Sequence, residues 1–293
     1  LSGVVLDEAA FMDKEVWSEV IRPALADKQG WALFISTPDG TASWFYDLWC
    51  YVPEDESGDW TRWSFTTIEG GNVPKDEVEA ARGQLDERTF RQEFEASFEN
   101  LTGLVAVSFS DENISDEAKD LHMLPLYMGV DFNVDPLCGV CAVKHNENLY
   151  VFDEIILRGG ATTWDFAEEV VNRYGVDRRV ITCPDPTGGA RKTSGVGLTD
   201  HTILRRSGFT VSSPRAPWKI RDKITAVNTA LFDAAGDRRT FIHPRCKELI
   251  KALRTLTYAP NTGMPNKNLG VDHAFDAFGY LCLQQFNLAK PET

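Results

Sequence analysis

The order of secondary-structure elements expected in the middle of the chain limits the possible folds most strongly. Three runs rich in β-branched and aromatic residues come first, a capped amphipathic helix follows, and a fourth such run comes last. These elements are expected over residues 127–133, 137–144, 149–156, 163–174 and 179–183. Three strands joined by short turns, then a helix and another strand, predict an α/β domain with a mixed sheet.

Carboxylates occur at two informative places in this region. Asp131 lies within the first strand, and its neighbours Val130 and Phe132 indicate a buried segment. Asp185 directly follows the fourth strand, between two prolines. A turn aspartate is the alternative interpretation of Asp185.

The segment 270–280 adds two acids and an imidazole on an expected helix. At 3.6 residues per turn, Asp272 and Asp276 lie on the same face, and His273 is a near neighbour of Asp276. Burying such a cluster is costly without a compensating cation, so the cluster favours a hard divalent metal, Mg²⁺ or Mn²⁺. The alternative is an N-cap aspartate followed by an ordinary amphipathic helix.

Phosphodiester hydrolysis by two metal ions requires several carboxylates from different elements. We expect Asp131 to bridge two ions, while Asp185 and Asp276 each complete one coordination sphere. His273 or Asp272 is expected to act as an auxiliary ligand or to orient water. The order β-β-β-α-β, with acids at these places, is that of ribonuclease-H-like nucleases.

The first part of the chain predicts a separate β-α-β unit. A short apolar run ends in Asp7 and Glu8, a helix is expected over 14–25, and a second apolar strand ends in Ser36 and Thr37. We expect both strands to be buried and parallel. Acids at one strand end beside a polar tip on the next are typical of the later half of a P-loop ATPase core.

The phosphate-binding loop of such an ATPase does not occur in the sequence. No G-x-x-x-x-G-K-[ST] motif is found, and in the nearest approach, 188–193, Arg191 takes the place of the required glycine. We therefore expect this chain to begin inside an ATPase domain, to turn over no ATP alone, and to bind ATP only within a full-length parent.

Charge is distributed unevenly. Residues 1–120 hold 9 Lys/Arg and 26 Asp/Glu, a balance of −17, whereas residues 121–293 hold 21 and 18, a balance of +3. The second part is therefore expected to meet a polyanion, although solvated helix faces are an alternative explanation of its basic residues. The candidate DNA contacts are Arg191, Lys192, Arg205, Arg206, Arg215, Lys219, Arg221 and Lys223. The absence of a base-reading motif predicts contact with the DNA backbone and little sequence specificity.

Composition excludes other classes. The chain has 293 residues, enough for two domains, and no apolar run reaches the roughly 18 residues that a membrane span needs. Cys138 and Cys141 form a C-x-x-C pair in an expected strand, so they point to opposite faces, and no second pair completes a zinc site. We expect them to be core residues.

Six short motifs occur in a consistent order along the chain. They are Val4–Ala10, Ser36–Gly40, Phe90–Phe94, Gly129–Asp131, Pro184–Gly188 and Asp272–Ala277. The combined pattern resembles the large terminase subunit of tailed bacteriophages, the DNA-packaging motor and headful-cutting nuclease. This resemblance implies a ribonuclease-H-like nuclease domain over 111–293, preceded over 1–110 by a truncated P-loop ATPase-like β-α-β remnant and a linker.

The resemblance also implies roles and partners. Asp7 and Glu8 would be the magnesium-site and catalytic acids of the motor, and Asp131, Asp185 and Asp276 would be the nuclease triad. The substrate would be double-stranded DNA. A full-length parent would bind the portal and the small terminase subunit and assemble into a ring, in the cytoplasm of an infected or lysogenic bacterial host and without a membrane.

Two other classes remain open from the sequence. A resolvase or transposase-type nuclease would share the fold and the acids, but it would not explain the β-α-β unit that ends in Asp7 and Glu8. A non-catalytic module that binds a packaging partner would fit the acidic first part. Metal-dependent nicking of plasmid DNA separates that module from the two enzymes.

Overall fold

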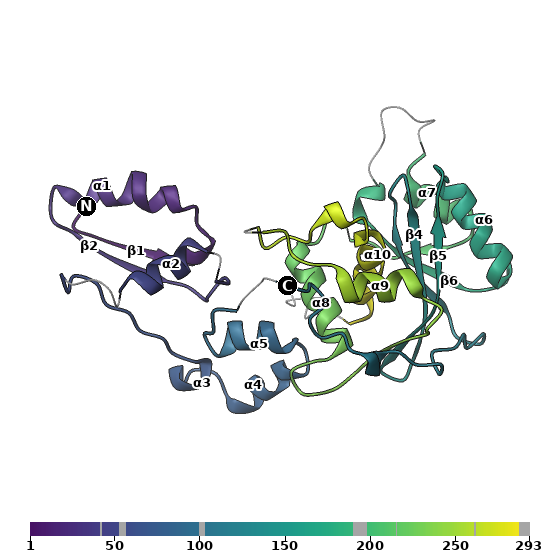
Figure 1. Ribbon diagram of the computed structural model, residues 1–293, viewed down its shortest axis with the longest axis horizontal. Coiled ribbons are helices and arrows are strands. Elements are labelled where there is room, and N and C mark those ends of the chain that lie inside the picture. The colour runs from purple at the N-terminus through teal and green to yellow at the C-terminus, as the bar shows by residue number, and fades with distance from the viewer. Residues whose placement is uncertain are drawn as a thin grey trace. The chain divides into compact units, whose positions relative to one another are not determined.

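The computed structural model describes residues 1–41, 43–52, 57–99, 103–189, 198–214, 216–260 and 262–286 (Figure 1). The chain divides into two compact units. The first comprises residues 1–81, 87–102 and 260–263, and the second comprises residues 82–86, 103–259 and 264–293.

The first unit is built on two parallel strands. Strands β1 (Gly3–Asp7) and β2 (Trp31–Ile35) pair in parallel, and a π-helical stretch with helix α1 connects them, as the sequence predicts. A cluster of aromatic rings packs beside β2, where the ring centroids of Phe34 and Trp17 lie 4.8 Å apart. The helical elements are Val16–Ile21, α1 (Arg22–Ala26), α2 (Trp44–Tyr51), α3 (Thr67–Gly70), α4 (Lys75–Arg82) and α5 (Glu87–Phe94).

The expectation that these two strands are buried is wrong for the described structure. Val5 is 51% exposed, and Leu33 and Ile35 are 38% and 48% exposed. A continuous apolar run is typical of a strand covered on both faces. Within the described residues, β1 and β2 form a two-stranded sheet, so each strand has one neighbour and much of its surface stays uncovered.

The second unit contains a six-stranded mixed sheet with the order β7-β6-β3-β4-β5-β8. The pairs β3–β4 and β4–β5 are antiparallel, whereas β3–β6, β5–β8 and β6–β7 are parallel. The predicted order of three strands, a helix and a fourth strand is confirmed. The strands are β3 (Leu126–Asp131), β4 (Leu137–His145), β5 (Asn148–Leu157), β6 (Val180–Pro184), β7 (Thr210–Val211) and β8 (Thr240–Ile242).

Helices cover both faces of this sheet (Figure 1). One hydrophobic core joins the sheet to α8, α9 and α10, and a second joins it to α6 and α7. Side chains alternate between the two cores along each strand, so Cys138 lies in the first core and Cys141 in the second, as predicted. The helices are α6 (Thr163–Tyr174), α7 (Asp200–Arg206), α8 (Ile220–Leu231), α9 (Lys247–Thr255) and α10 (Asp272–Gln285). Over the described part of the chain, every helix is too short or too polar to cross a bilayer.

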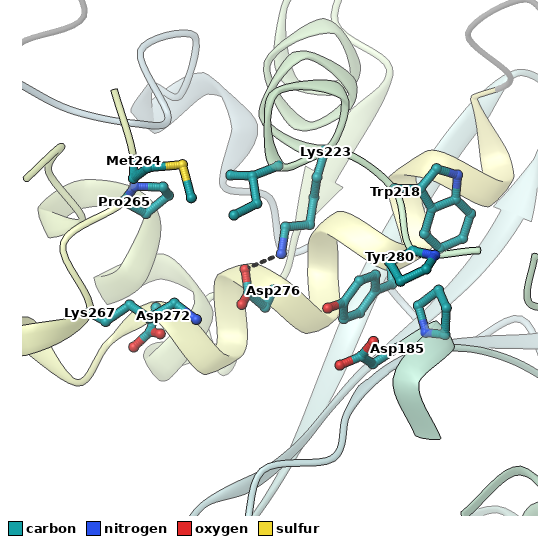
Figure 2. A pocket seen from close by; sticks show the side chains of 12 residues that line it. Asp185, Trp218, Lys223, Met264, Pro265, Lys267, Asp272, Asp276 and Tyr280 are labelled. Carbon is teal, nitrogen blue, oxygen red and sulfur yellow. Dashed lines mark hydrogen bonds and ion pairs between the residues drawn. The ribbon is translucent and has the colours of Figure 1, made fainter. Parts of the chain in front are cut away.

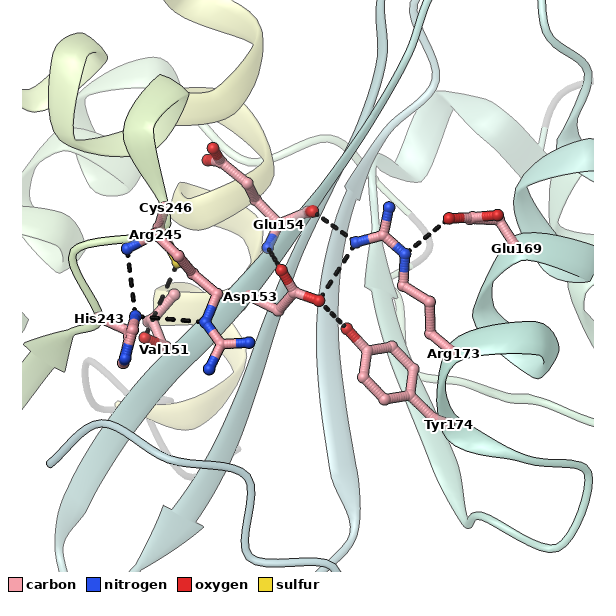
Figure 3. A network of polar contacts seen from close by, with 9 residues as sticks. All are labelled: Val151, Asp153, Glu154, Glu169, Arg173, Tyr174, His243, Arg245 and Cys246. Atoms are coloured by element: carbon pink, nitrogen blue, oxygen red, sulfur yellow. Dashed lines mark hydrogen bonds and ion pairs between the residues drawn. The ribbon is translucent and has the colours of Figure 1, made fainter. Parts of the chain in front are cut away.

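Neighbouring acids on β5 fix helices on opposite sides of the sheet, and Figure 3 shows the contacts that Asp153 makes with Arg173 and Tyr174 of α6. Asp153 accepts hydrogen bonds from Arg173 Nη1 at 3.1 Å and from the Tyr174 hydroxyl at 2.7 Å, both on α6. Glu154 accepts the backbone N–H groups of Glu248 and Leu249, each at 2.9 Å, where α9 begins. Burial raises the pKa of Glu154, while these two N–H bonds oppose the rise. The β5 side chains therefore position α6 and α9 independently.

Candidate functional site

Two predicted acids meet at one edge of the second unit's sheet. Asp131 is the last residue of β3, and Asp185 directly follows the neighbouring parallel strand β6. The Asp185 backbone N–H donates to the Val130 carbonyl oxygen at 2.9 Å. Because parallel strands end at the same edge, both carboxylates lie at the carboxyl end of the sheet.

Helix α10 brings the remaining acids to this edge because it lies unusually close to β3. A Cβ atom placed on Gly129 would be 1.9 Å from the Ala277 carbonyl oxygen and 3.0 Å from Leu281 Cβ. Only a glycine permits this approach of helix and strand. Residues 127, 129 and 131 share one face of β3, so Asp131 lies on the face that α10 covers.

His273 links α10 directly to Asp131. Its Nδ1 lies 3.0 Å from Asp131 Oδ2, and because a carboxylate only accepts, Nδ1 carries the proton and donates. Asn133 Nδ2 donates to the Asp135 carbonyl oxygen at 3.0 Å, so this amide presents an N–H to His273 Nε2, 3.1 Å away. The hydrogen bond to Asp131 raises the pKa of His273, whereas burial opposes the rise. The imidazole thereby fixes the orientation of the Asp131 carboxylate.

Asp276 has a partner that the sequence did not reveal. Lys223 Nζ, on α8, lies 2.5 Å from Asp276 Oδ1, and both side chains are largely buried. Burial raises the pKa of Asp276, and the Lys223 ammonium counteracts this rise. The two residues are 53 positions apart, so only the packing of α8 against α10 brings them together.

A cavity of about 310 Å³ opens beside this ion pair. Figure 2 shows Asp276 and Asp272 on its α10 wall, with Asp185 across from them near Tyr280. The Trp218 and Tyr280 rings stack at 6.1 Å on one side. Burial raises the pKa of the Tyr280 phenol, and the Asp185 carboxylate raises it further, so this hydroxyl stays protonated as a donor facing the acids.

The chemistry of these residues fits hard divalent cations. Asp272 is 4% exposed, and its buried Oδ1 has no hydrogen-bond partner within the part of the chain that the structure describes. An unsatisfied buried carboxylate oxygen is costly, and a hard cation would satisfy it. Across the described residues, however, no three His, Cys, Asp or Glu side chains lie close enough together to hold an ion as arranged. Asp131 and Asp276 instead each have a protein partner, His273 and Lys223.

The predicted DNA contacts are found at different kinds of position. Exposed side chains belong to Arg205 and Arg206 at the end of α7 and to Lys219 and Arg221 around the start of α8. Lys223 differs from this expectation because it is 6% exposed and faces the acids rather than solvent. The remaining candidates, Arg191, Lys192 and Arg215, lie outside the described residues.

In the first unit, the predicted ATPase residues lie together at the carboxyl ends of β1 and β2. The Ser36 hydroxyl donates to Glu8 Oε2 at 3.4 Å and accepts the Ala10 N–H at 3.2 Å. Asp7 is exposed, and Thr37 is half-buried beside Ser36. Glu8 has a left-handed backbone with a φ of 54°, a strained conformation that clusters at functional sites when a residue is not glycine.

Sequence reasoning did not identify Lys223, Asn133 and Tyr280 as members of the acidic site. Lys223 was assigned to the DNA surface because basic residues surround it in sequence. The available signal for burial was helical periodicity, because Lys223 shares a helix face with the apolar residues Val227 and Ala230. Asn133 and Tyr280 carried no pattern that separates them from ordinary loop and helix residues.

The mixed six-stranded sheet with helices on both faces defines the fold class as α/β, with the order of elements that we expected of a ribonuclease-H-like domain. Residues 1–121 match the family described as "Terminase large subunit, T4likevirus-type, N-terminal". A stretch of 192 residues, 60% of this chain, is 28% identical to the large terminase subunit of Escherichia phage T5 and covers 43% of that protein. A stretch of 48 residues, 16% of this chain, is 54% identical to the large terminase subunit of Thermus phage G20c and covers 10% of it.

The structure is also similar to a solved large terminase from a thermophilic bacteriophage. It superposes on that structure with a TM-score of 0.70 and 17% identity, over 97% of this chain and 68% of the other. At this identity the likeness establishes the fold. The resemblance to large terminase subunits that the six motifs indicate is confirmed, and the chain's match spans less than half the length of the phage T5 relative.

Proposed function

We propose that this chain is part of a phage DNA-packaging enzyme and that residues 111–293 form an endonuclease that cuts double-stranded, concatemeric DNA with divalent metal ions. The observation that carries the proposal is the convergence of carboxylates from three elements at one sheet edge, where a buried Asp272 oxygen has no hydrogen-bond partner among the described residues. Such a set of hard oxygen donors suits Mg²⁺ or Mn²⁺.

Within this proposal, Asp131, Asp185 and Asp276 would hold two ions, with Asp272 or His273 as an auxiliary. Bound divalent ions activate a water for attack and stabilise the leaving oxygen of the phosphodiester. The protein's own contribution is positioning. His273 holds one oxygen of Asp131 through its Nδ1 proton, and the tight Gly129 contact fixes α10 against β3.

The substrate would be bound through its phosphates. Arg205, Arg206, Lys219 and Arg221 are exposed in the second unit and would contact the DNA backbone without reading its sequence. Residues 1–110, which include Asp7, Glu8, Ser36 and Thr37, would be the later part of a packaging ATPase that binds ATP only in a full-length parent. The portal, the small terminase subunit and ring assembly would belong to that parent, inside the bacterial host.

Nicking of supercoiled plasmid DNA tests the nuclease proposal. With Mn²⁺ or Mg²⁺, wild-type protein is expected to relax and linearise the plasmid, and EDTA should stop it. Asp131→Asn should abolish cleavage because the loss of one negative charge from a shared ligand forfeits much of the affinity for the metal ions. Asp276→Asn should behave similarly, and Asp272→Asn should be milder.

Asp222→Asn is the matched control, since Asp222 is an exposed acid in the first turn of α8. It should cleave like wild type. Full cleavage by a folded Asp131→Asn protein would refute the assignment. No metal-dependent cleavage by wild type would favour a non-catalytic packaging module instead.

A further inference from the structure

Lys223 is buried in a way that a surface phosphate contact would not require. Its side chain is 8% exposed and its ammonium pairs with Asp276 Oδ1 at 2.5 Å. The same Nζ lies 4.8 Å from the centroid of the Tyr280 ring, a cation–π contact. Burying a lysine is costly unless its charge is compensated, and here a carboxylate and an aromatic face compensate it.

Helix α10 makes room for this lysine at Gly279. A Cβ atom on Gly279 would be 2.4 Å from Lys223 Cγ and 2.6 Å from Cδ. A glycine inside a helix is unfavourable relative to alanine. The helix thus contains a poor helix former at the position where the lysine stem crosses it. The buried ion pair is therefore built into the packing of α8 against α10.

The Lys223 ammonium is itself a cation that lies among the acids of the cavity. Lys223 lines the cavity together with Asp185, Asp272 and Asp276. Two positive charges that share one carboxylate repel each other, and the repulsion is strong where water is largely excluded. A divalent ion that binds Asp276 must therefore share or displace this partner.

We propose that Lys223 is a positioning residue, a built-in counter-cation of the acidic cluster that holds Asp276 in place before metal ions bind and weakens the cluster's affinity for metal. This inference rests on the proposed nuclease function, because it assumes that Asp276 is a metal ligand. If Lys223 served only to stabilise the fold, its replacement would leave the affinity for metal unchanged or lower.

Binding of Mn²⁺ alone to the full chain tests the inference without DNA or cleavage. Titration calorimetry on EDTA-stripped protein would compare wild type with Lys223→Met, which keeps much of the side-chain volume and removes the charge. We expect Lys223→Met to bind Mn²⁺ about tenfold more tightly. Lys251→Met is the matched control: the same substitution at an exposed lysine of α9, with wild-type affinity expected.

Gly279→Ala is the second variant, used also if Lys223→Met does not fold. Its added methyl group must push the Lys223 stem aside and weaken the Asp276 pair while keeping the charge, so Mn²⁺ should again bind more tightly. Unchanged or weaker binding in the folded variants overturns the inference. Asp131→Asn separates the two failures: if wild type and Asp131→Asn bind Mn²⁺ equally, the proposed metal site itself is wrong.

Discussion

Replacing Gly129 by alanine should separate the strand acids from the helix acids. The new Cβ would be 1.9 Å from the Ala277 carbonyl oxygen, whereas ordinary contact begins near 3.4 Å, so α10 and β3 must part by about 1.5 Å. Overpacking of this kind typically destabilises a protein by about 1–3 kcal/mol, which lowers the melting temperature of a domain of this size by about 2–12 °C. The contact is with backbone, so no side-chain rotation relieves it.

The same displacement should damage the site more than the fold. A misplacement of about 1 Å can cost about a hundredfold in rate, so Gly129→Ala should slow plasmid nicking by that order and weaken Mn²⁺ binding. The assays are calorimetric Mn²⁺ titration and gel-based nicking, with melting followed by circular dichroism.

Gly139→Ala provides the matched control on the neighbouring strand. Gly139 pairs with Val130, and its added Cβ would meet the Phe166 ring at 2.6 Å, on the face that α6 covers. Gly139→Ala should therefore lose stability but keep its affinity for Mn²⁺. If Gly129→Ala bound Mn²⁺ like wild type, or if Gly139→Ala lost affinity to the same extent, the proposed role of the Gly129 contact would be refuted.

Three further predictions concern stability. Arg173→Ala should lower the free energy of unfolding by about 1 kcal/mol, because Asp153 and the Glu154 carbonyl lose a donor, and it should leave Mn²⁺ affinity unchanged; urea unfolding and titration would check both. In EDTA, the difference in free energy of unfolding between wild type and His273→Gln should be largest below about pH 6.5, because Asp131 raises the pKa of His273 in the folded protein. This difference should shrink as the pH rises through that raised pKa. An equal difference at acid and alkaline pH would contradict the prediction. Amide protons of β1 and β2 should exchange faster than those of β3 and β4, given the exposure of Val5 and Leu33, and slower exchange in β1 would contradict the view that the first unit is the less stable one.

The strands of the second unit were predictable because their signal is local. An apolar run and the turn residues after it predicted β4 over 137–144, and the structure has Leu137–His145. The sequence offered Thr162 or Thr163 as the cap of α6, and the structure uses Thr162, whose hydroxyl accepts the Asp165 N–H at 3.3 Å. Burial of the first unit was predicted wrongly, because the apolar runs of β1 and β2 reveal their propensity but not how many strands lie beside them.

The sequence by itself determined which acids stand at strand ends and on the late helix, since residue order and helical periodicity place Asp131, Asp185 and Asp276 without any long-range contact. Only the tertiary structure decided their partners. In the sequence, Lys223 cannot be told from the basic residues around it, and Gly129 cannot be told from an ordinary strand glycine. The packing of α8 on α10 and the contact of Gly129 with the Ala277 carbonyl distinguish them. Burial and close approach are properties of packed elements, so a local pattern can name the acids of a candidate site but not the lysine that pairs with one of them.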